Sequence, residues 1–142
     1  LVMPEVSAFA QFDTLENLLE AVVIKRYGDE DIAELAIGDA QVIAAGVRRS
    51  EGEALTVSIR AGDIIVSRQI PPQTSARNAI KARMSEIHCV DSRVLVYADV
   101  GTRIMVEITL SSLDALELKE GTDIYLIIKA NSVIPLEGAG SR

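Results

Sequence analysis

The sequence predicts an all-β fold made of two similar units in tandem, with one short helix in the second unit. Three observations lead to this prediction. Short runs rich in β-branched residues alternate with turn signals along most of the 142 residues. Two segments of the first half recur, in the same order, in the second half. A Pro-Pro step separates the halves, and consecutive prolines hold the chain extended.

The first half contains five strand-like runs that end at turn or loop residues. Turn signals stand at residues 28–31 (Gly-Asp-Glu-Asp) and at Gly38-Asp39, and the charged stretch 48–53 is typical of a solvated loop. Runs this short, bounded in this way, indicate a small sandwich or barrel. The expected strands cover residues 20–27, 32–37, 41–47, 55–59 and 63–67.

The second half repeats this pattern after the linker at residues 70–73. A short helix is expected over residues 111–118, with Ser111 or Ser112 as its N-cap. The Gly-rich stretch 137–142 is expected to be frayed. The expected strands cover residues 79–87, 93–100, 103–110, 123–129 and 132–136.

The two halves align as copies with a small insertion. Residues 16–21 align with 77–82 at an offset of 61, and residues 58–65 align with 127–134 at an offset of 69. The second copy is therefore about eight residues longer, which is roughly the length of the expected helix. Chance similarity of short β-units is the alternative to duplication.

Composition excludes several classes of function. The formal net charge of −7 argues against general nucleic-acid binding, which requires a basic surface. Five aromatic residues without tryptophan are too few for a base-stacking platform. The apolar runs are far too short to span a bilayer, and no signal peptide is visible, so no direct membrane insertion is expected. The non-Met first residue suggests a piece of a longer protein.

The chain has one cysteine, Cys89, and one histidine, His88. A single cysteine forms no internal disulfide, which fits a reducing compartment. Glu86 and His88 would share one face of a strand, but without a second His or Cys a zinc site is not expected. Cys89 is expected to be a small core residue, as free cysteines commonly are. His88 and Cys89 would point to opposite faces, which disfavours a nucleophilic pair.

Two five-residue segments carry the ingredients of an oxyanion site. They are Thr74-Ser75-Ala76-Arg77-Asn78 and Lys129-Ala130-Asn131-Ser132-Val133, at the two ends of the second copy. Arg, Lys, hydroxyl groups and the backbone N–H groups of a turn can together hold a compact tetrahedral anion. Ordinary surface ion pairs are the alternative for each cation taken alone.

The first copy differs at the position of Arg77. Arg60 matches Lys129, but Glu16 replaces Arg77, and a carboxylate there would repel a dianion. Only the second copy is therefore expected to keep such a site. Phosphate-loop, dinucleotide-binding and nucleophile-elbow motifs are all absent from the sequence, so catalysis by this chain is not expected.

The T-S-A-R-N segment, the pair Ile108-Thr109 and the K-A-N-S-V segment resemble the molbindin, or Mop, family over about residues 74–136. The first half is similar to the TOBE-type barrel that follows the nucleotide-binding domain of importer ATPases, and residues 9–20 look like the exit from such a domain. This resemblance implies two OB-like five-stranded barrels. The expected division is an exit segment 1–14, a degenerate TOBE-like barrel 15–70, a Pro linker 71–73 and a Mop-type barrel 74–137.

The resemblance also implies a function. The family binds molybdate and tungstate, and it includes the C-terminal regulatory domains of molybdate-importer ABC ATPases, in which oxyanion sites lie between barrels and often between subunits. It implies no cofactor and no bare metal ion, only molybdate or tungstate as the ligand. The positions carried over are Ser75, Arg77, Thr109, Lys129, the backbone at Ala130 and Ser132.

The expected partners follow from that function. A homodimer would form through the barrels, and the longer parent, an ABC transporter ATPase, would pair with a membrane permease at the cytoplasmic face of the membrane and would bind no nucleic acid. The alternatives are a free-standing molbindin that stores oxyanion and a purely structural dimerisation barrel.

Overall fold

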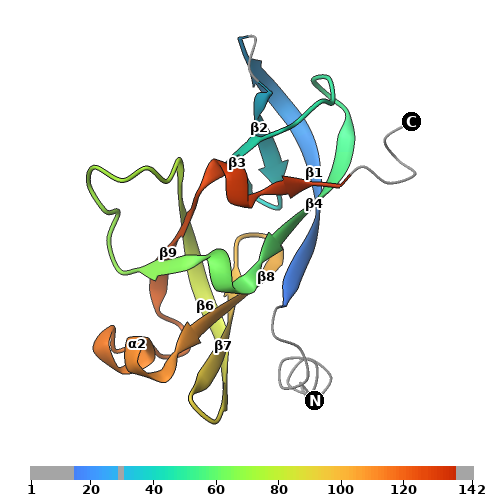
Figure 1. The fold of residues 1–142 in the computed structure, drawn as a ribbon. Coiled ribbons are helices and arrows are strands. Elements are labelled where there is room, and N and C mark those ends of the chain that lie inside the picture. Colours follow the sequence, from blue (N-terminus) through green and yellow to red (C-terminus); the bar gives the residue numbers. More distant parts are fainter. Residues whose placement is uncertain (1–14, 29–30, 137–142) are drawn as a thin grey trace.

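The computed structural model describes residues 15–28 and 31–136. The predicted exit segment 1–14 and the Gly-rich stretch 137–142 lie outside these residues. The described chain folds into two curled five-stranded sheets joined side by side (Figure 1). The all-β prediction of two OB-like barrels with a short helix in the second is confirmed.

The first sheet has the strand order β10-β4-β1-β2-β3. All its neighbouring strands are antiparallel. The bounds are β1 Glu16–Tyr27, β2 Ile32–Ile37, β3 Ala40–Ala45, β4 Ala54–Arg60 and β10 Ile134–Pro135.

The second sheet has the order β5-β9-β6-β7-β8 and is also antiparallel. Short 3-10 helices follow β4 and β9, namely η1 (Ala61–Asp63) and η2 (Ala130–Ser132). The bounds of the strands are β5 Ile65–Ser67, β6 Asn78–Val90, β7 Arg93–Asp99, β8 Arg103–Thr109 and β9 Asp123–Ile128.

The two sheets exchange their last short strands. β5 comes from the first half but pairs with β9, so that Ile65 faces Ile127. β10 comes from the second half but pairs with β4, so that Ile134 faces Ser58. The expected division at residues 71–73 therefore separates the sequence copies, whereas each barrel in space contains a strand from the other copy.

The internal repeat is visible in the backbone as well as in the sequence. The register between β1 and β2 shifts between Val23 and Lys25, and that between β6 and β7 shifts between Met84 and Glu86. Both positions differ by the 61 residues that separate the aligned segments. Alternate residues of β1 and β6 point into one continuous apolar core, which both sheets share.

The predicted helix exists but begins earlier than expected. α2 covers Leu110–Ala115, and its N-cap is Thr109, whose hydroxyl accepts a hydrogen bond from the Ser112 N–H. The prediction of Ser111 or Ser112 as the N-cap was wrong, because Thr109 has the extended backbone that an N-cap requires. Among the described residues, no helix has the length and apolar character needed to cross a membrane.

The prediction that Cys89 is a core residue was also wrong, because its side chain is exposed. β6 pairs with β9 only as far as Arg83, and its remaining residues pair with β7 alone. Cys89 lies on this overhanging part of the strand. The expected proximity of Glu86 and His88 is correct, with 2.9 Å between Glu86 Oε1 and His88 Nε2. In the described part of the chain, no cluster of His, Cys, Asp and Glu could hold a metal ion.

Candidate oxyanion site

The start of β6 is anchored by the buried side chain of Asn78. Its amide nitrogen donates to the carbonyl oxygens of Ile43 (2.9 Å) and Ile128 (3.1 Å), and its amide oxygen accepts from the Ile43 N–H (2.7 Å). The side chain thus makes both hydrogen bonds that a neighbouring strand would make with Ile43. It joins β6 to the edge strand β3 of the other sheet and sets the position of the residues just before it.

Asn17 does the same at the start of β1. Its amide donates to the carbonyl oxygens of Ile59 (3.0 Å) and Met105 (2.9 Å) and accepts from the Met105 N–H (2.7 Å). The two asparagines are aligned in the repeat, so the molecule has two equivalent corners, one at each strand start. The sequence alignment of the two copies pairs these asparagines but assigns them no role. The sign in the sequence is an Asn at the same place in both copies, within a strand pattern in which Asn is uncommon.

Arg77 and Lys129 meet at the Asn78 corner. Asn78 and Ile128 are direct cross-strand partners, so the residue before β6 and the residue after β9 lie next to each other. Both side chains are exposed, and neither forms an ion pair with any residue that the structure describes. This corner therefore brings together two cations that have no carboxylate partner within the described chain.

The turn after Lys129 adds a backbone donor. In the first copy, the Ala61 N–H donates to the Leu15 carbonyl at 2.8 Å. The equivalent Ala130 N–H makes no hydrogen bond with the part of the chain that the structure describes. It is the first N–H of η2, and a free backbone donor of this kind can bind an anion. The two copies thus differ in backbone hydrogen bonding as well as in side-chain charge.

Two of the three predicted hydroxyl residues, Ser75 and Ser132, lie near the Asn78 corner. Ser75 is exposed in the turn before Arg77, where the Ala76 N–H donates to Thr74 Oγ1 at 3.1 Å. Ser132 is half-buried in η2, and its N–H donates to the Lys129 carbonyl at 3.0 Å. Ser75 and Ser132 therefore belong to the same corner as Arg77, Lys129 and Ala130.

Thr109 lies at the opposite end of β6 from the other predicted site residues. It pairs with Arg93, which pairs with Val90 at the end of the 13-residue strand. Its hydroxyl also donates to Ser112 Oγ at 3.0 Å. One chain thus places five of the six predicted site residues together and leaves Thr109 far from them.

A tyrosine–glutamate pair from the first sheet lies within electrostatic range of Arg77. Tyr27 donates its phenol hydrogen to Glu34 Oε1 at 2.9 Å. This hydrogen bond raises the pKa of Tyr27 above its ordinary value of 10.0; desolvation and the Glu34 charge act in the same direction, and the Arg77 cation opposes them. Glu34 is also the cross-strand partner of Ile43, to which Asn78 is bonded. Asn78 thus holds the start of β6 near the Tyr27–Glu34 pair.

The equivalent corner at Asn17 has a carboxylate in place of the arginine, while Arg60 keeps the cation that matches Lys129. Glu16 Oε1 accepts a hydrogen bond from the buried Ser58 hydroxyl at 2.7 Å. A hollow of about 290 Å³ beside it is lined by Glu16, Tyr97, Arg103 and other residues. A carboxylate fixed at this corner disfavours a dianion, in agreement with the sequence argument.

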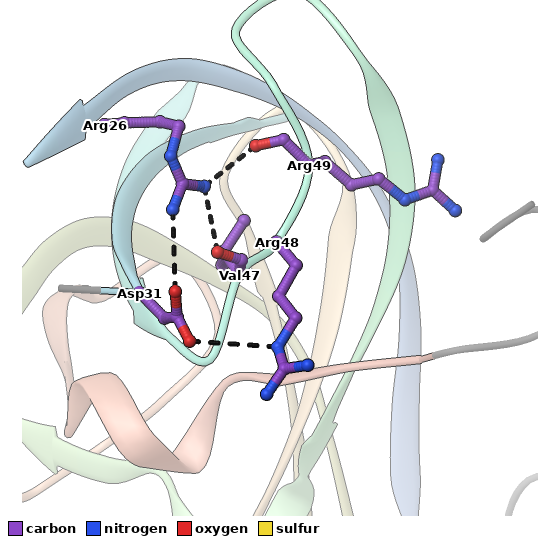
Figure 2. Close-up of polar contacts among 5 residues, drawn as sticks. All are labelled: Arg26, Asp31, Val47, Arg48 and Arg49. Carbon is purple, nitrogen blue, oxygen red and sulfur yellow. Dashed lines mark hydrogen bonds and ion pairs between the residues drawn. The ribbon is translucent and has the colours of Figure 1, made fainter. Parts of the chain in front are cut away.

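The arginines near the other end of β1 are engaged in structural contacts (Figure 2). Arg26 donates from Nη1 to the carbonyl oxygens of Val47 and Arg49, both at 2.8 Å. Asp31 lies 3.8 Å from Arg26 Nη2 and 3.8 Å from Arg48 Nε. This cluster fastens the loop between β3 and β4, and its charges are partly neutralised by Asp31.

One protein-family model matches the second copy of the repeat. The family model for the TOBE domain matches residues 74–135, which include all six predicted site residues. The matched residues are those of the second copy of the repeat. The TOBE match agrees with the predicted TOBE/Mop resemblance and with the prediction of a domain that is not itself catalytic.

Two relatives are molybdenum import ATP-binding proteins, both named ModC. The protein from Photobacterium profundum is 39% identical over 90 residues, which are 61% of this chain and 25% of the relative. That from Haemophilus influenzae is 33% identical over 101 residues, which are 70% of this chain and 29% of the relative. The chain therefore spans about a quarter to a third of the length of the curated relatives it matches.

A solved structure shares the whole architecture. The cytoplasmic molybdate-binding protein ModG, in a crystal form with molybdate bound, superimposes with a TM-score of 0.73. The match covers 88% of this chain and 97% of that chain at 19% sequence identity. At this identity the likeness establishes the tandem-barrel fold and no more.

Proposed function

We propose that this chain is the molybdate-binding regulatory domain of an ABC importer ATPase. The observation that carries the proposal is the corner at Asn78, where Arg77, Lys129 and the free Ala130 N–H meet inside the TOBE domain. The ModC relatives, named as molybdenum import proteins, support molybdate as the ligand and support a longer parent that contains an ATP-binding domain.

The corner suits a compact tetrahedral dianion. Arg77 offers a planar fork of donors, Lys129 a point charge, and Ser75, Ser132 and the Ala130 N–H neutral donors that fix orientation. Because the formal charge of the whole chain is −7, binding depends on these local donors. Tungstate has nearly the size and charge of molybdate, so the same donors would hold both anions.

The position of Thr109 supports a site completed by a second chain. Its hydroxyl lies at the far end of β6 from Arg77, beside the Ser112 hydroxyl at the start of α2. In a homodimer, the Thr109 end of one chain would meet the Arg77 corner of the other. An anion bound there contacts both chains and stabilises the dimer by mass action.

Feedback control of uptake follows if the anion prefers one state of the transporter. High internal molybdate would hold the paired regulatory domains in one arrangement, and the coupling would equal the difference in anion affinity between the two states. The parent protein would then act with a membrane permease at the cytoplasmic face of the membrane.

Calorimetric titration of the chain with molybdate, tungstate and sulfate tests the proposal. Arg77→Glu is expected to weaken molybdate binding at least 100-fold, by removing a charge-assisted donor and adding repulsion. Arg48→Glu is the matched control, because Arg48 is exposed and lies in the separate cluster around Asp31. Equal binding by both variants would contradict the site, and no binding by the wild-type chain would favour a structural dimerisation barrel.

A mixing experiment tests whether the site needs two chains. Arg77→Glu and Thr109→Ala should each bind molybdate poorly alone. In a mixed dimer, one of the two sites would combine an intact Arg77 with an intact Thr109. Random exchange makes about half of the dimers mixed, so recovery of about a quarter of all sites is expected on mixing, and no recovery would place the complete site within one chain.

A further inference from the structure

The two asparagine corners rest on matching positions of the two sheets. Lys25 of β1 and Glu86 of β6 are 61 residues apart, which is the offset of the repeat at these strands. Their cross-strand partners are Glu34 and Tyr97, respectively. Glu34 of β2 therefore holds the place in the first sheet that Tyr97 of β7 holds in the second.

At the corner of the first copy, the Tyr97 position is covered by apolar side chains. Leu15, Ala61, Leu95 and Tyr97 form a small apolar cluster, and Tyr97 is only 1% exposed. Ala61 belongs to η1, which lies against β8 beside this cluster. An apolar plug, with Leu15 as its largest covering side chain, therefore closes the outer face of the sheet here.

At the corner that holds Arg77, the matching position is charged and less covered. The residue equivalent to Leu15 is Ala76, which has a much smaller side chain, and Glu34 below it is only half-buried. η2, which begins with Ala130, lies against β3, the strand next to Glu34. The Glu34 carboxylate therefore belongs to the floor of the corner in which Arg77 and the free Ala130 N–H meet.

Two neighbours on β1 flank the Glu34 side chain. Tyr27 donates its phenol hydrogen to Glu34 Oε1 at 2.9 Å. Lys25 is the cross-strand partner of Glu34, and its Nζ lies 5.2 Å from the centre of the Tyr27 ring. Glu34 forms no ion pair with any residue that the structure describes. Its charge is therefore held in place by a neutral donor and is not cancelled by direct contact with a cation.

We infer that Glu34 sets the affinity of the Arg77 corner by opposing the charge of the bound dianion, and that Lys25 acts in the opposite direction. Like charges repel more strongly in a partly buried site than in bulk water, so the carboxylate holds the affinity below the value that Arg77 and Lys129 would give without it. The first copy, which has lost the arginine of its own corner, thereby becomes part of the site of the second copy.

This inference rests on the proposed function and adds to it a reason for limited affinity. A regulatory domain must release its anion when the internal concentration falls, because a site that is saturated at every concentration reports no change. A fixed carboxylate in the floor provides this limit without altering the donors that orient the anion. The effect of the Arg77 cation on the Tyr27 phenol agrees with the placement of the Tyr27–Glu34 pair within electrostatic range of the corner.

Calorimetric titration of charge variants with molybdate tests the inference. Glu34→Gln removes the charge and keeps the size of the side chain and an acceptor for Tyr27, so affinity should rise about threefold to tenfold. Lys25→Gln should lower affinity by a similar factor. Asp63→Asn is the matched control, because Asp63 is an exposed carboxylate in η1, at the corner without the arginine. Thermal melting checks that each variant folds, and Lys25→Gln decides the question if Glu34→Gln does not fold.

Salt separates an effect of charge from an effect of shape. The gain in Glu34→Gln should shrink as sodium chloride is raised from about 0.05 M to about 0.5 M, because screening shortens the range of the repulsion. A gain that does not depend on salt, or an affinity that Glu34→Gln leaves unchanged or lowers while Arg77→Glu abolishes binding, would overturn this inference alone. A wild-type chain that binds no molybdate, with no binding in Glu34→Gln either, would overturn the proposed function and this inference with it.

Discussion

The start of β1 and the start of β6 are held by the same contacts and surrounded by different chemistry. At each, a buried asparagine makes three hydrogen bonds, two of them to an edge strand of the other sheet. Around Asn17, the next side chain is Glu16 and the turn N–H of Ala61 is bonded to Leu15. Around Asn78, the next side chain is Arg77 and the Ala130 N–H has no partner among the described residues.

This difference separates what the fold needs from what the site needs. Both asparagines hold the two barrels together, so both corners keep them. The charge beside each asparagine faces solvent and does not affect the joint, so it can differ between the copies. The backbone donor also differs between the copies. The Ala61 N–H is used in a hydrogen bond to the Leu15 carbonyl, whereas the Ala130 N–H has no such bond among the described residues and can donate to an anion.

The strongest test of this difference is to give the first corner the same charge as the second. Glu16→Arg should not create a second molybdate site, because the Ala61 N–H remains bonded to Leu15 and so cannot donate to an anion. We expect affinity at the new corner to stay at least 100-fold below that at Arg77. Calorimetric stoichiometry measures this, with Arg77→Glu in the same chain used to silence the original site. One site per chain in that double variant would show that charge alone decides.

The asparagines provide the next largest effect. Asn17→Ala and Asn78→Ala should each lower the free energy of unfolding by about 2–3 kcal/mol, because each removes three hydrogen bonds at about 1 kcal/mol apiece and leaves buried backbone groups unpaired. Chemical denaturation measures this loss. Only Asn78→Ala should also weaken molybdate binding, because only Asn78 positions Arg77. Equal losses of binding in both variants would mean that the two corners are coupled through the fold.

Much of this architecture could be predicted from the sequence. The β-branched runs and turn residues predicted the strands closely, and the aligned segments predicted the repeat that the shared register shifts display. The exchange of β5 and β10 could not be predicted, because strands of three and two residues carry no pattern that selects one partner over another. Local alternation favours a strand in either barrel equally well.

The candidate site could likewise be predicted only in part from the sequence. Arg77 and Lys129 were predicted to lie together because each adjoins an end of the second copy, and the β6–β9 register agrees. The free N–H of Ala130 could not be predicted, since it depends on whether the carbonyl of a distant turn reaches it. Cys89 was misplaced because the length by which β6 extends beyond β9 is a property of the sheet and not of the residues around the cysteine.

The smallest effect to measure is the ionisation of Tyr27, which reports on the Arg77 corner from outside it. Removing the hydrogen bond and charge in Glu34→Ala should lower the Tyr27 pKa, and removing the cation in Arg77→Ala should raise it further above 10.0. Absorbance titration of the phenol measures both shifts, with Tyr27→Phe as the reference that removes its signal from those of the other two tyrosines. Molybdate bound at Arg77 neutralises the same cation, so it should raise the Tyr27 pKa in the wild-type chain and leave it unchanged in Arg77→Ala. A molybdate-induced shift of equal size in both would place the anion away from Arg77, because only the neutralisation of that side chain links the two groups.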